Sequence, residues 1–497
     1  MLYICIIDMP DKKYKLILLI VLFLFLIFRL PGLGKDISNS DAVRWHRRSE
    51  DFLNALKSGN FADTYQHYQP GVTLMWLDAF VNDVSFRYQI YKGLEPKTLE
   101  NSTHYPVVHG ISKSLLVLVL GALLFVQVFL VRKLFGNEIS LVFGFFISVE
   151  PYLIGINRWF HLTSLETFFS FASFLFILNW YKFRNNKLVI FSAVFLGLSV
   201  LSKLTTLIVA PLYLIVFSLA YKQKKDVSFA LFGVVFLFTF FILFPAMWID
   251  SVSVISKLYD AASKAVTDNY ASDLLPASIL PIYYFVILGF KVSPITLLMF
   301  VSGLFVLVKK KEIITDKLKL LVVLNFLLYF VLLTLAEQKI DRYSIAIFPP
   351  LILISCFGFD HLAKRVKYVV LSLSSLFILF AAYVYYPVYS AYYSPVLGGT
   401  AGALKVGVYD NSGEYYAQAA LYLSGKDRNN NVYVPYNYES FSYFYNGNMQ
   451  RNYDLNTNYL VTSVEHLDDI SEAVGCANVD STFGSKEKEI VYVFFCK

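Results

Sequence analysis

A short polar segment near the start of the chain combines a carboxylate with arginines at helical spacing. The segment holds Asp41, Arg44, Trp45 and Arg48. Because residues three and four apart lie on one side of a helix, these side chains would share a face. A carboxylate beside arginines stays ionised and can take a proton from a bound hydroxyl group. The same pattern also suits an interfacial helix in which Asp and Arg pair and Trp anchors at lipid headgroups.

Further polar and ionisable residues lie farther along the chain, most of them near the ends of long apolar runs. These residues are His67, Tyr68, Gln69, Arg158, His161, Glu166, Lys203, Lys339, Arg342 and Tyr343. Guanidinium and ammonium groups match phosphate oxygens, so Arg342 and Lys339 at the end of a run could bind a phosphate. An ionisable residue at membrane depth is costly and is a functional candidate, which applies to Glu166 and Lys203. Two alternatives stay open: Lys203 reaches the interface along its apolar stem, and His161 is structural.

The composition shows which elements must position these residues. Of the 497 residues, 57% are hydrophobic and only 16% are charged, whereas roughly 25% of an average soluble domain is charged. This composition excludes a soluble enzyme, a disordered chain, a collagen and a coiled coil. The apolar runs are continuous and do not alternate, which excludes a membrane β-barrel. The sequence therefore predicts an all-α polytopic membrane protein.

Eleven apolar runs are candidates for membrane-spanning helices, although the fifth and sixth are short and meet at Ser202-Lys203. They cover residues 15–33, 112–131, 138–156, 163–181, 188–202, 204–221, 227–248, 280–308, 318–336, 344–360 and 367–386. The net charge of +7 does not indicate nucleic-acid binding, because Lys and Arg occur in short clusters between these runs. If the N-terminus is cytoplasmic, all six clusters fall on the cytoplasmic side, as positive charges do in membrane proteins. The polar residues named above then lie on the extracytoplasmic side, many of them in a first outer loop over residues 34–111.

The chain divides into a membrane domain over residues 1–386 and a polar tail over residues 387–497. The tail alternates β-type runs with helix-like stretches, which predicts a small extracytoplasmic α/β domain. The expected strands cover 406–409, 432–435, 459–464 and 490–495, and the expected helices cover 413–424 and 464–474. Cys476 and Cys496 lie in this tail and could pair if it faces an oxidising compartment. The chain carries no Walker loop, dinucleotide fingerprint, zinc-ligand spacing or Gly-x-Ser-x-Gly motif.

Five short motifs follow one another along the predicted outer face. They are Ser40-Asp41-Ala42-Val43-Arg44-Trp45, Tyr68-Gln69-Pro70-Gly71-Val72-Thr73, Phe244-Pro245-Ala246-Met247-Trp248, Lys339-Ile340-Asp341-Arg342-Tyr343 and Tyr393-Ser394-Pro395-Val396-Leu397-Gly398-Gly399. In this order they resemble the motifs of membrane glycosyltransferases with the C-type fold. The resemblance is closest to the prokaryotic branch related to dolichyl-phosphate-mannose protein mannosyltransferases (family 39). The chain departs from that pattern at Gln69, where the related motif has His, and at Thr163, where related sequences often carry Asp.

The resemblance implies transfer of a sugar, such as the hexose mannose, from a polyprenyl-phosphate donor to a protein, lipid or glycan acceptor at the extracytoplasmic face of the cell membrane. It implies one inverting displacement with Asp41 as the base and Glu166 as a second acidic residue. The donor phosphate would contact Lys203, Lys339, Arg342 and Arg158. Other substrate groups would contact Arg44, Trp45, His67, Tyr68, Gln69, His161 and Tyr343. A divalent cation, Mg or Mn, helps some enzymes of this class, and the sequence leaves this point open.

Two other functions remain open. A secondary transporter or lipid flippase is also polytopic, but such proteins often carry inverted repeats and broken helices near the midplane. This chain shows no internal repeat, and its polar residues gather on one predicted face. A non-catalytic membrane subunit of an envelope glycan assembly would use the aromatic residues of the tail to bind a partner, although these residues also suit packing within the tail.

Overall fold

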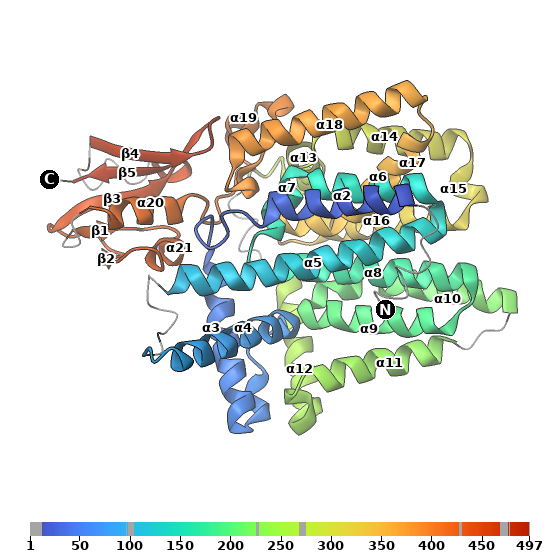
Figure 1. Cartoon of the computed structure of the whole chain (residues 1–497), viewed down its shortest axis with the longest axis horizontal. Helices are drawn as coiled ribbons and strands as arrows, with labels where there is room; N and C mark the ends of the chain where they lie inside the picture. Colours follow the sequence, from blue (N-terminus) through green and yellow to red (C-terminus); the bar gives the residue numbers. More distant parts are fainter. Residues whose placement is uncertain are drawn as a thin grey trace.

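The computed structural model describes residues 12–95, 97, 104–224, 228–267, 275–426, 430–467, 476 and 478–496. Within these ranges the chain forms a bundle of helices with a small sheet domain at one end (Figure 1). The end of the bundle that carries this domain is named the sheet end. The predicted fold class, an all-α membrane domain followed by a small α/β domain, is confirmed.

Every apolar run predicted to span the membrane coincides with helix within the described residues. The elements are α2 (Lys12–Arg29), α5 (Tyr105–Phe135), α6 (Asn137–Val149) with α7 (Pro151–Asn157), α8 (Leu162–Phe183), α9 (Asn186–Ser202), η2 (Leu204–Val209) with α10 (Ala210–Lys224), α11 (Ser228–Leu243), η3 (Leu280–Ile282) and α13 (Tyr283–Lys291) with α14 (Pro294–Lys309), α16 (Lys317–Leu335), η4 (Asp341–Ile347) with α17 (Phe348–Asp360), and α18 (Lys364–Tyr385). By length and composition, six of the described helices could cross a membrane, or nine if each of three bent pairs counts as one span. The two other predicted spans coincide with α2, which begins with lysines, and with α9, which has 17 residues.

Apolar side chains cover much of the outside of the bundle. The exposed residues include Val234, Leu237, Phe238 and Phe241 on α11 and Leu373, Leu376, Leu379 and Phe380 on α18. A surface of this kind is rare on soluble monomers and suits contact with lipid. Together with the apolar helices, it identifies a multi-pass membrane protein.

Three helix pairs are sharply bent near the sheet end. α6 and α7 meet at 68°, α11 and the first part of α12 (Ala246–Thr267) meet at 111°, and α13 and α14 meet at 119°. Glu150 joins two of these breaks, because its carboxylate accepts a hydrogen bond from the backbone N–H of Ser293 at 2.6 Å. The hydroxyl groups of Ser293 and Thr296 donate to the same carboxylate at 2.8 Å each. Polar groups at the two breaks are therefore satisfied inside the bundle.

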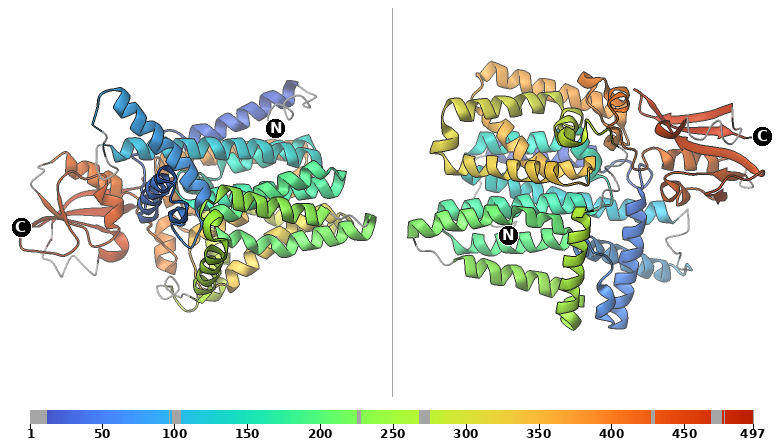
Figure 2. Two further views of the ribbon diagram at one scale, coloured as in Figure 1. Left: turned by 90° about the horizontal axis from the view of Figure 1, so that it is seen from below. Right: turned by 180° about the vertical axis from the view of Figure 1, so that it is seen from behind.

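The predicted outer loop over residues 34–111 is mostly helical. It contains α3 (Ser40–Ser58), η1 (Phe61–Thr64), α4 (Val72–Tyr91) and the start of α5, which begins seven residues earlier than expected. Asn39 caps α3 by accepting a hydrogen bond from the backbone N–H of Ala42, and Gly59 ends the helix with a left-handed φ of 73°. α3 and α12 lie crosswise to the bundle at its sheet end (Figure 1, Figure 2).

The sheet domain has five strands in the order β2-β1-β3-β5-β4. The strands are β1 (Asn431–Tyr433), β2 (Asn448–Gln450), β3 (Thr457–Ser463), β4 (Asn478–Gly484) and β5 (Glu489–Phe495). β1 pairs in parallel with β2 and β3, whereas β5 pairs antiparallel with β3 and β4. Helix α20 (Tyr416–Ser424) packs against β4 and β5, and α21 (Tyr438–Ser442) contacts α3. The remaining short elements are α15 (Glu312–Thr315), η5 (Tyr389–Ala391), η6 (Pro395–Leu397), α19 (Gly399–Val406) and η7 (Val464–His466).

Two details of the predicted tail are corrected. Residues 406–409, expected as a strand, form the end of α19 and the loop after it, because Gly407 takes a left-handed φ of 77° and ends the helix. The structure also adds β2 and β4, whose polar sequences lack the alternation of a half-buried strand. The other expected strands correspond to β1, β3 and β5, and the first expected helix corresponds to α20. Most of the helix expected over 464–474 lies outside the described residues.

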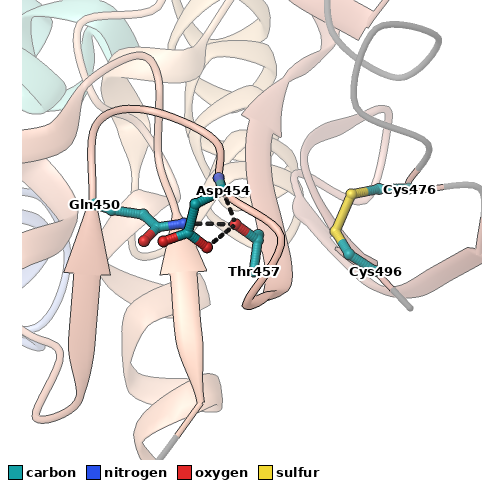
Figure 3. Close-up of a disulfide and its surroundings, with 5 residues drawn as sticks. All are labelled: Gln450, Asp454, Thr457, Cys476 and Cys496. Atoms are coloured by element: carbon teal, nitrogen blue, oxygen red, sulfur yellow. Dashed lines mark hydrogen bonds between the residues drawn. A yellow bond between two sulfur atoms is a disulfide. The ribbon is translucent and has the colours of Figure 1, made fainter.

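A disulfide joins Cys476 to Cys496, directly after β5 (Figure 3). The sequence left this pairing open. The hydroxyl of Thr457 accepts hydrogen bonds from the backbone N–H of Asp454 and from the side-chain amide of Gln450. These contacts close the connection between β2 and β3 on the other side of the sheet domain (Figure 3).

The first part of the tail packs directly on the bundle. η5 lies against α7 at Gly155, where an added Cβ would lie 2.3 Å from the backbone nitrogen of Ser390. The hydroxyl of Ser390 donates a hydrogen bond to the carboxylate of Glu414 at 2.8 Å, and the backbone N–H of Ser412 donates at 2.7 Å. Glu414 is therefore a buried acidic side chain held by η5, the element that lies on the bundle.

Stability is expected to fall as the pH rises through the range in which Glu414 titrates. Burial raises the pKa of Glu414 from 4.5 to about 7, so the folded protein holds a proton that the unfolded chain releases. The resulting stabilisation, about 3 kcal/mol, is complete below the unfolded pKa and is lost as the pH approaches the folded value. We expect the unfolding temperature in lipid nanodiscs to fall over this range, and to fall less in Glu414→Gln. An equal pH dependence in the variant would assign the effect to other groups.

Candidate active site

The carboxylate of Asp41, in the first turn of α3, is the centre of a polar cluster at the sheet end. Its Oδ2 lies 2.9 Å from Nη2 of Arg342, which belongs to η4. The same oxygen lies 3.5 Å from Nε2 of His161, and Oδ1 lies 3.9 Å from Nη1 of Arg44. Burial raises the pKa of Asp41, but the hydrogen bond from His161 and the charge of Arg342 outweigh this effect and hold the pKa below its usual range. Asp41 is therefore ionised at neutral pH.

His161 precedes α8 in a geometry that fixes its tautomer. Its Nδ1 accepts a hydrogen bond from the backbone N–H of Thr163 at 3.2 Å, and the Thr163 hydroxyl lies 2.7 Å from the same atom. Burial lowers the pKa of His161 to about 4, although Asp41 opposes this effect, so the ring is neutral. Since Nδ1 is an acceptor, the single ring proton is on Nε2, the atom that faces Asp41.

Lys203 occupies the break between α9 and η2, where its backbone is extended. Its Nζ lies 3.7 Å from the ring centroid of Tyr343 and 3.9 Å from Oε2 of Glu166. The hydroxyl groups of Thr205 and Thr206 donate hydrogen bonds to the other carboxylate oxygen of Glu166. Glu166, buried in α8, therefore fixes both the break and its lysine.

The turn that precedes α4 is held against the same break. Oε1 of Gln69 accepts a hydrogen bond from the backbone N–H of Leu204 at 3.2 Å. The backbone N–H of Gly71 donates to the carbonyl of Ser202, also at 3.2 Å. These two hydrogen bonds hold the backbone at Ser202 and Leu204, on either side of Lys203, so the turn fixes the position of that lysine.

Replacing Gly71 by Ala is expected to lower the free energy of unfolding by about 2 kcal/mol, through backbone strain and overpacking. Gly71 has a φ of 61°, and an added Cβ would lie 2.2 Å from the ring of Trp45. Thermal unfolding in lipid nanodiscs measures the effect. Gly59→Ala is a matched control, because Gly59 has a φ of 73° and no atom within 4 Å of an added Cβ. Equal losses in both variants would show that the Trp45 contact contributes nothing.

These groups line one cavity of about 170 Å³ at the sheet end. Its lining consists of Asp41, Arg44, Trp45, Arg48, His67, Tyr68, Gln69, His161, Leu162, Lys203, Gln338, Ile340, Arg342 and Tyr343. Four of these residues are Lys or Arg and one is acidic, so the cavity attracts an anionic group. The structure thus brings together ten of the thirteen residues that the sequence predicted for the site.

Three predicted residues lie outside this lining. Glu166 lies behind Lys203, as described above. Arg158 is buried, and its Nη1 donates to backbone carbonyls at and after the end of α2 at 2.9 and 2.8 Å. The Nζ of Lys339 donates to three carbonyls at the end of α16. The last carbonyls of a helix have no partner within the helix, and Arg158 and Lys339 donate hydrogen bonds to such carbonyls. These two side chains therefore do not reach the cavity.

The cavity also contains residues to which the sequence assigned no role. Gln338 accepts a hydrogen bond from the Tyr343 hydroxyl at 3.3 Å, and the guanidinium of Arg48 lies 4.6 Å from the ring centroid of Trp45. Arg48 was visible as a member of the helical face that carries Asp41. Nothing in the sequence indicated that Gln338 lines a site, except that it precedes the motif that contains Arg342 and Tyr343.

Neither protein-family models nor curated proteins match this sequence. Among solved structures, ArnT from Cupriavidus metallidurans bound to undecaprenyl phosphate is similar with a TM-score of 0.53 and 13% identity, over 96% of this chain and 97% of that chain. The chain has the C-type glycosyltransferase fold. The oligosaccharyltransferase AglB from Archaeoglobus fulgidus, in complex with an inhibitory peptide and a dolichol-phosphate, has a TM-score of 0.47 and 11% identity, over 92% of this chain and 70% of that chain.

Some enzymes with the C-type fold use a divalent cation, and the residues of this cavity do not fit one. Among the described residues, no group of three or more His, Cys, Asp or Glu side chains is arranged so that it could hold a metal ion. The single carboxylate of the cavity lining, Asp41, is already paired with Arg342. The cationic side chains that line this cavity are Arg44, Arg48, Lys203 and Arg342.

Proposed function

We propose that the protein transfers a sugar, a hexose such as mannose, from a polyprenyl-phosphate donor to a hydroxyl group of a protein, lipid or glycan acceptor. One observation carries the proposal: an ionised carboxylate and several cations line the same small cavity at one end of a membrane bundle. A hydroxyl acceptor needs a base, and a departing phosphate needs positive charge. The solved ArnT structure of the same fold binds undecaprenyl phosphate, which is a polyprenyl phosphate.

In the proposed reaction the acceptor oxygen attacks the anomeric carbon while the bond from that carbon to the phosphate oxygen breaks. Asp41 takes the hydroxyl proton, and the bonding electrons pass to the phosphate. Arg342 and Lys203 stabilise the charge that develops there. A single displacement inverts the anomeric centre and requires no covalent intermediate on the enzyme. Glu166 acts through Lys203, whose ammonium it holds at the cavity.

Arg342 links the base to the donor. In the structure its guanidinium is paired with Asp41. A donor phosphate that enters the cavity competes for this guanidinium, because phosphate and carboxylate bind the same donors. Asp41 then loses part of the stabilisation of its charged form, so its pKa rises and it becomes a stronger base. Donor binding thereby prepares the carboxylate for proton transfer.

We infer that the cavity and the sheet domain face the extracytoplasmic side and that the N-terminus is cytoplasmic. Predicted cytoplasmic basic residues gather at the end of the bundle away from the sheet. There the Nζ of Lys182 donates to the carbonyls of Lys133 and Leu134, and Lys367 pairs with Glu138. Lys and Arg at this end suit a cytoplasmic position. A disulfide in the sheet domain suits an oxidising compartment.

A transfer assay with the purified protein in lipid tests the proposed activity. Radiolabelled polyprenyl-phosphate sugars that differ in the sugar are supplied singly with extracted cell-envelope acceptors. We expect label from one donor to move to an acceptor and the free polyprenyl phosphate to appear in equal amount. A folded protein that consumes none of the donors but moves labelled lipid across proteoliposomes would instead be a flippase.

A further inference from the structure

Three buried side chains from three helices form a continuous series of hydrogen-bonding contacts beside α3. Nδ1 of His46 on α3 lies 2.9 Å from Oδ2 of Asp78 on α4. Nε2 of His46 lies 2.9 Å from Nδ1 of His109 on α5. Nε2 of His109 lies 3.0 Å from the backbone oxygen of Ile37. None of the three side chains is more than 1% exposed, so these contacts are shielded from bulk water.

The geometry fixes the number of protons in this triad. The oxygen of Ile37 can only accept, so His109 carries a proton on Nε2. The contact between the two rings needs a second proton, and the contact with Asp78 needs a third. Oδ1 of Asp78 accepts a hydrogen bond from Ser112 at 2.6 Å, so the third proton lies between Oδ2 of Asp78 and Nδ1 of His46. A carboxylate and two neutral imidazoles together hold only two protons, so the third proton balances the charge of Asp78 and makes the triad neutral.

Charged groups near the triad are paired with one another. Nζ of Lys113 lies 2.6 Å from Oδ1 of Asp36, and Nη2 of Arg158 lies 3.0 Å from Oδ2 of Asp36. Lys113 also donates to the oxygen of Ile37 at 3.0 Å, so the two networks share one acceptor. Lys113, Arg158 and Asp36 thus form a separate ionic network of two cations and one carboxylate beside the triad.

Aromatic rings enclose the two imidazoles. Phe160 stacks on His46 with 4.1 Å between ring centroids, and Tyr105 stacks on His109 at 5.1 Å. In such surroundings a net charge is poorly solvated, which favours the neutral three-proton state over states with one proton more or fewer. The triad holds α3 to α4 and α5, and α3 carries Asp41 in its first turn.

We propose that Asp78, His46 and His109 are positioning residues, a neutral three-proton triad that fixes α3 and thereby aims Asp41 into the cavity. Loss of the third proton at high pH leaves two acceptor atoms facing each other and one net buried charge. Either consequence loosens α3. The effect on Asp41 rests on the proposed function, whereas the hold of the triad on α3 does not.

The variant Asp78→Asn keeps the shape of the triad, but its contacts no longer need the third proton. The amide Nδ2 donates to Nδ1 of a neutral His46, and the amide oxygen still accepts from Ser112. All contacts are then satisfied with two ring protons, and Asn82, whose amide lies 3.4 Å from Asp78, turns its oxygen to the new amide group. His46→Phe is the comparison variant, because it keeps an aromatic ring against Phe160 and removes the hydrogen bonds.

Hydrogen exchange of the α3 backbone in lipid nanodiscs, corrected for the intrinsic effect of pH, tests the proposal. In the wild type we expect protection of α3 to fall by about tenfold as the third proton is lost at high pH, the effect of one buried hydrogen bond. Asp78→Asn should keep its protection over the same range, and His46→Phe should have low protection at every pH. If donor turnover is found, its alkaline limb should disappear in Asp78→Asn.

Two results would overturn the proposal. Wild type and Asp78→Asn with the same pH dependence would show that the triad holds no third proton. Low protection at every pH in Asp78→Asn would show that the charge of Asp78, and not the hydrogen-bond pattern, holds α3. Because exchange is measured without substrate, failure of the proposed sugar transfer would leave these outcomes unchanged.

Discussion

Replacing Asp41 by Asn is expected to reduce sugar transfer by about 10²- to 10⁴-fold, the usual contribution of a positioned general base. Asn has the shape of Asp, but it cannot take the acceptor proton. Donor binding should not weaken, because Arg342 and Lys203 remain, so the loss should appear in kcat and not in KM. Initial rates with a radiolabelled donor in lipid nanodiscs measure the effect.

Asp51→Asn is the matched control for this experiment. Asp51 lies on the same helix α3 and is exposed, so the substitution changes the same charge away from the cavity. We expect Asp51→Asn to keep the wild-type rate, and both variants to keep the wild-type unfolding temperature within a few degrees. Full activity of Asp41→Asn would show that Asp41 is not the base. Glu166, which lies behind Lys203, would then be the next candidate.

The membrane helices could be predicted because of a strict physical constraint. In lipid every backbone polar group must be paired within the segment, so long apolar runs become helices. The bends could not be predicted in this way. Residues 280–308 read as one run, yet they form α13 and α14 at 119°. The break is stabilised by Glu150, which lies 143 residues from Ser293 and belongs to another helix pair.

Local sequence identified the kind of side chain at the site but not its direction. Arg158, Lys203, Lys339 and Arg342 all lie beside the end of an apolar run. In the structure Lys203 and Arg342 line the cavity, whereas Arg158 and Lys339 bond to carbonyls at helix ends. Which partner a long cation reaches depends on how distant segments pack, and spacing along the chain does not contain this information.

The two departures from the related motifs have structural roles in this chain. Gln69, in place of His, accepts a hydrogen bond from the backbone beside Lys203. Thr163, in place of Asp, bonds to Nδ1 of His161 and so directs the Nε2 proton to Asp41. Both residues act on groups of the cavity through a neighbour. The sequence alone shows only that an imidazole and a carboxylate are missing. It does not show the contacts of Gln69 and Thr163, because these depend on how separate segments pack.

Replacing Arg342 by Gln is expected to lower kcat by about 10²- to 10³-fold, the usual loss when one group that stabilises a developing anion is removed. Arg342→Lys should recover part of this loss, because an ammonium keeps the charge but not the planar fork that matches phosphate. Arg87→Gln is the matched control, since Arg87 lies on α4 with a side chain 74% exposed and pairs with Asp83. Single-turnover rates at saturating donor separate the chemical step from donor binding.

The pH profile of kcat/KM distinguishes an effect of Arg342 on the pKa of Asp41 from a purely structural role of Arg342. Arg342 stabilises the charged form of Asp41 and contributes to its lowered pKa. Without the guanidinium that pKa rises, and Asp41 works as a base only above its pKa, so the acid limb of the profile should move to higher pH in Arg342→Gln. Arg342→Lys should move it less, because the charge is retained. A variant that loses activity equally at every pH would show that Arg342 does not act on Asp41, and would leave it as a contact to the donor phosphate alone.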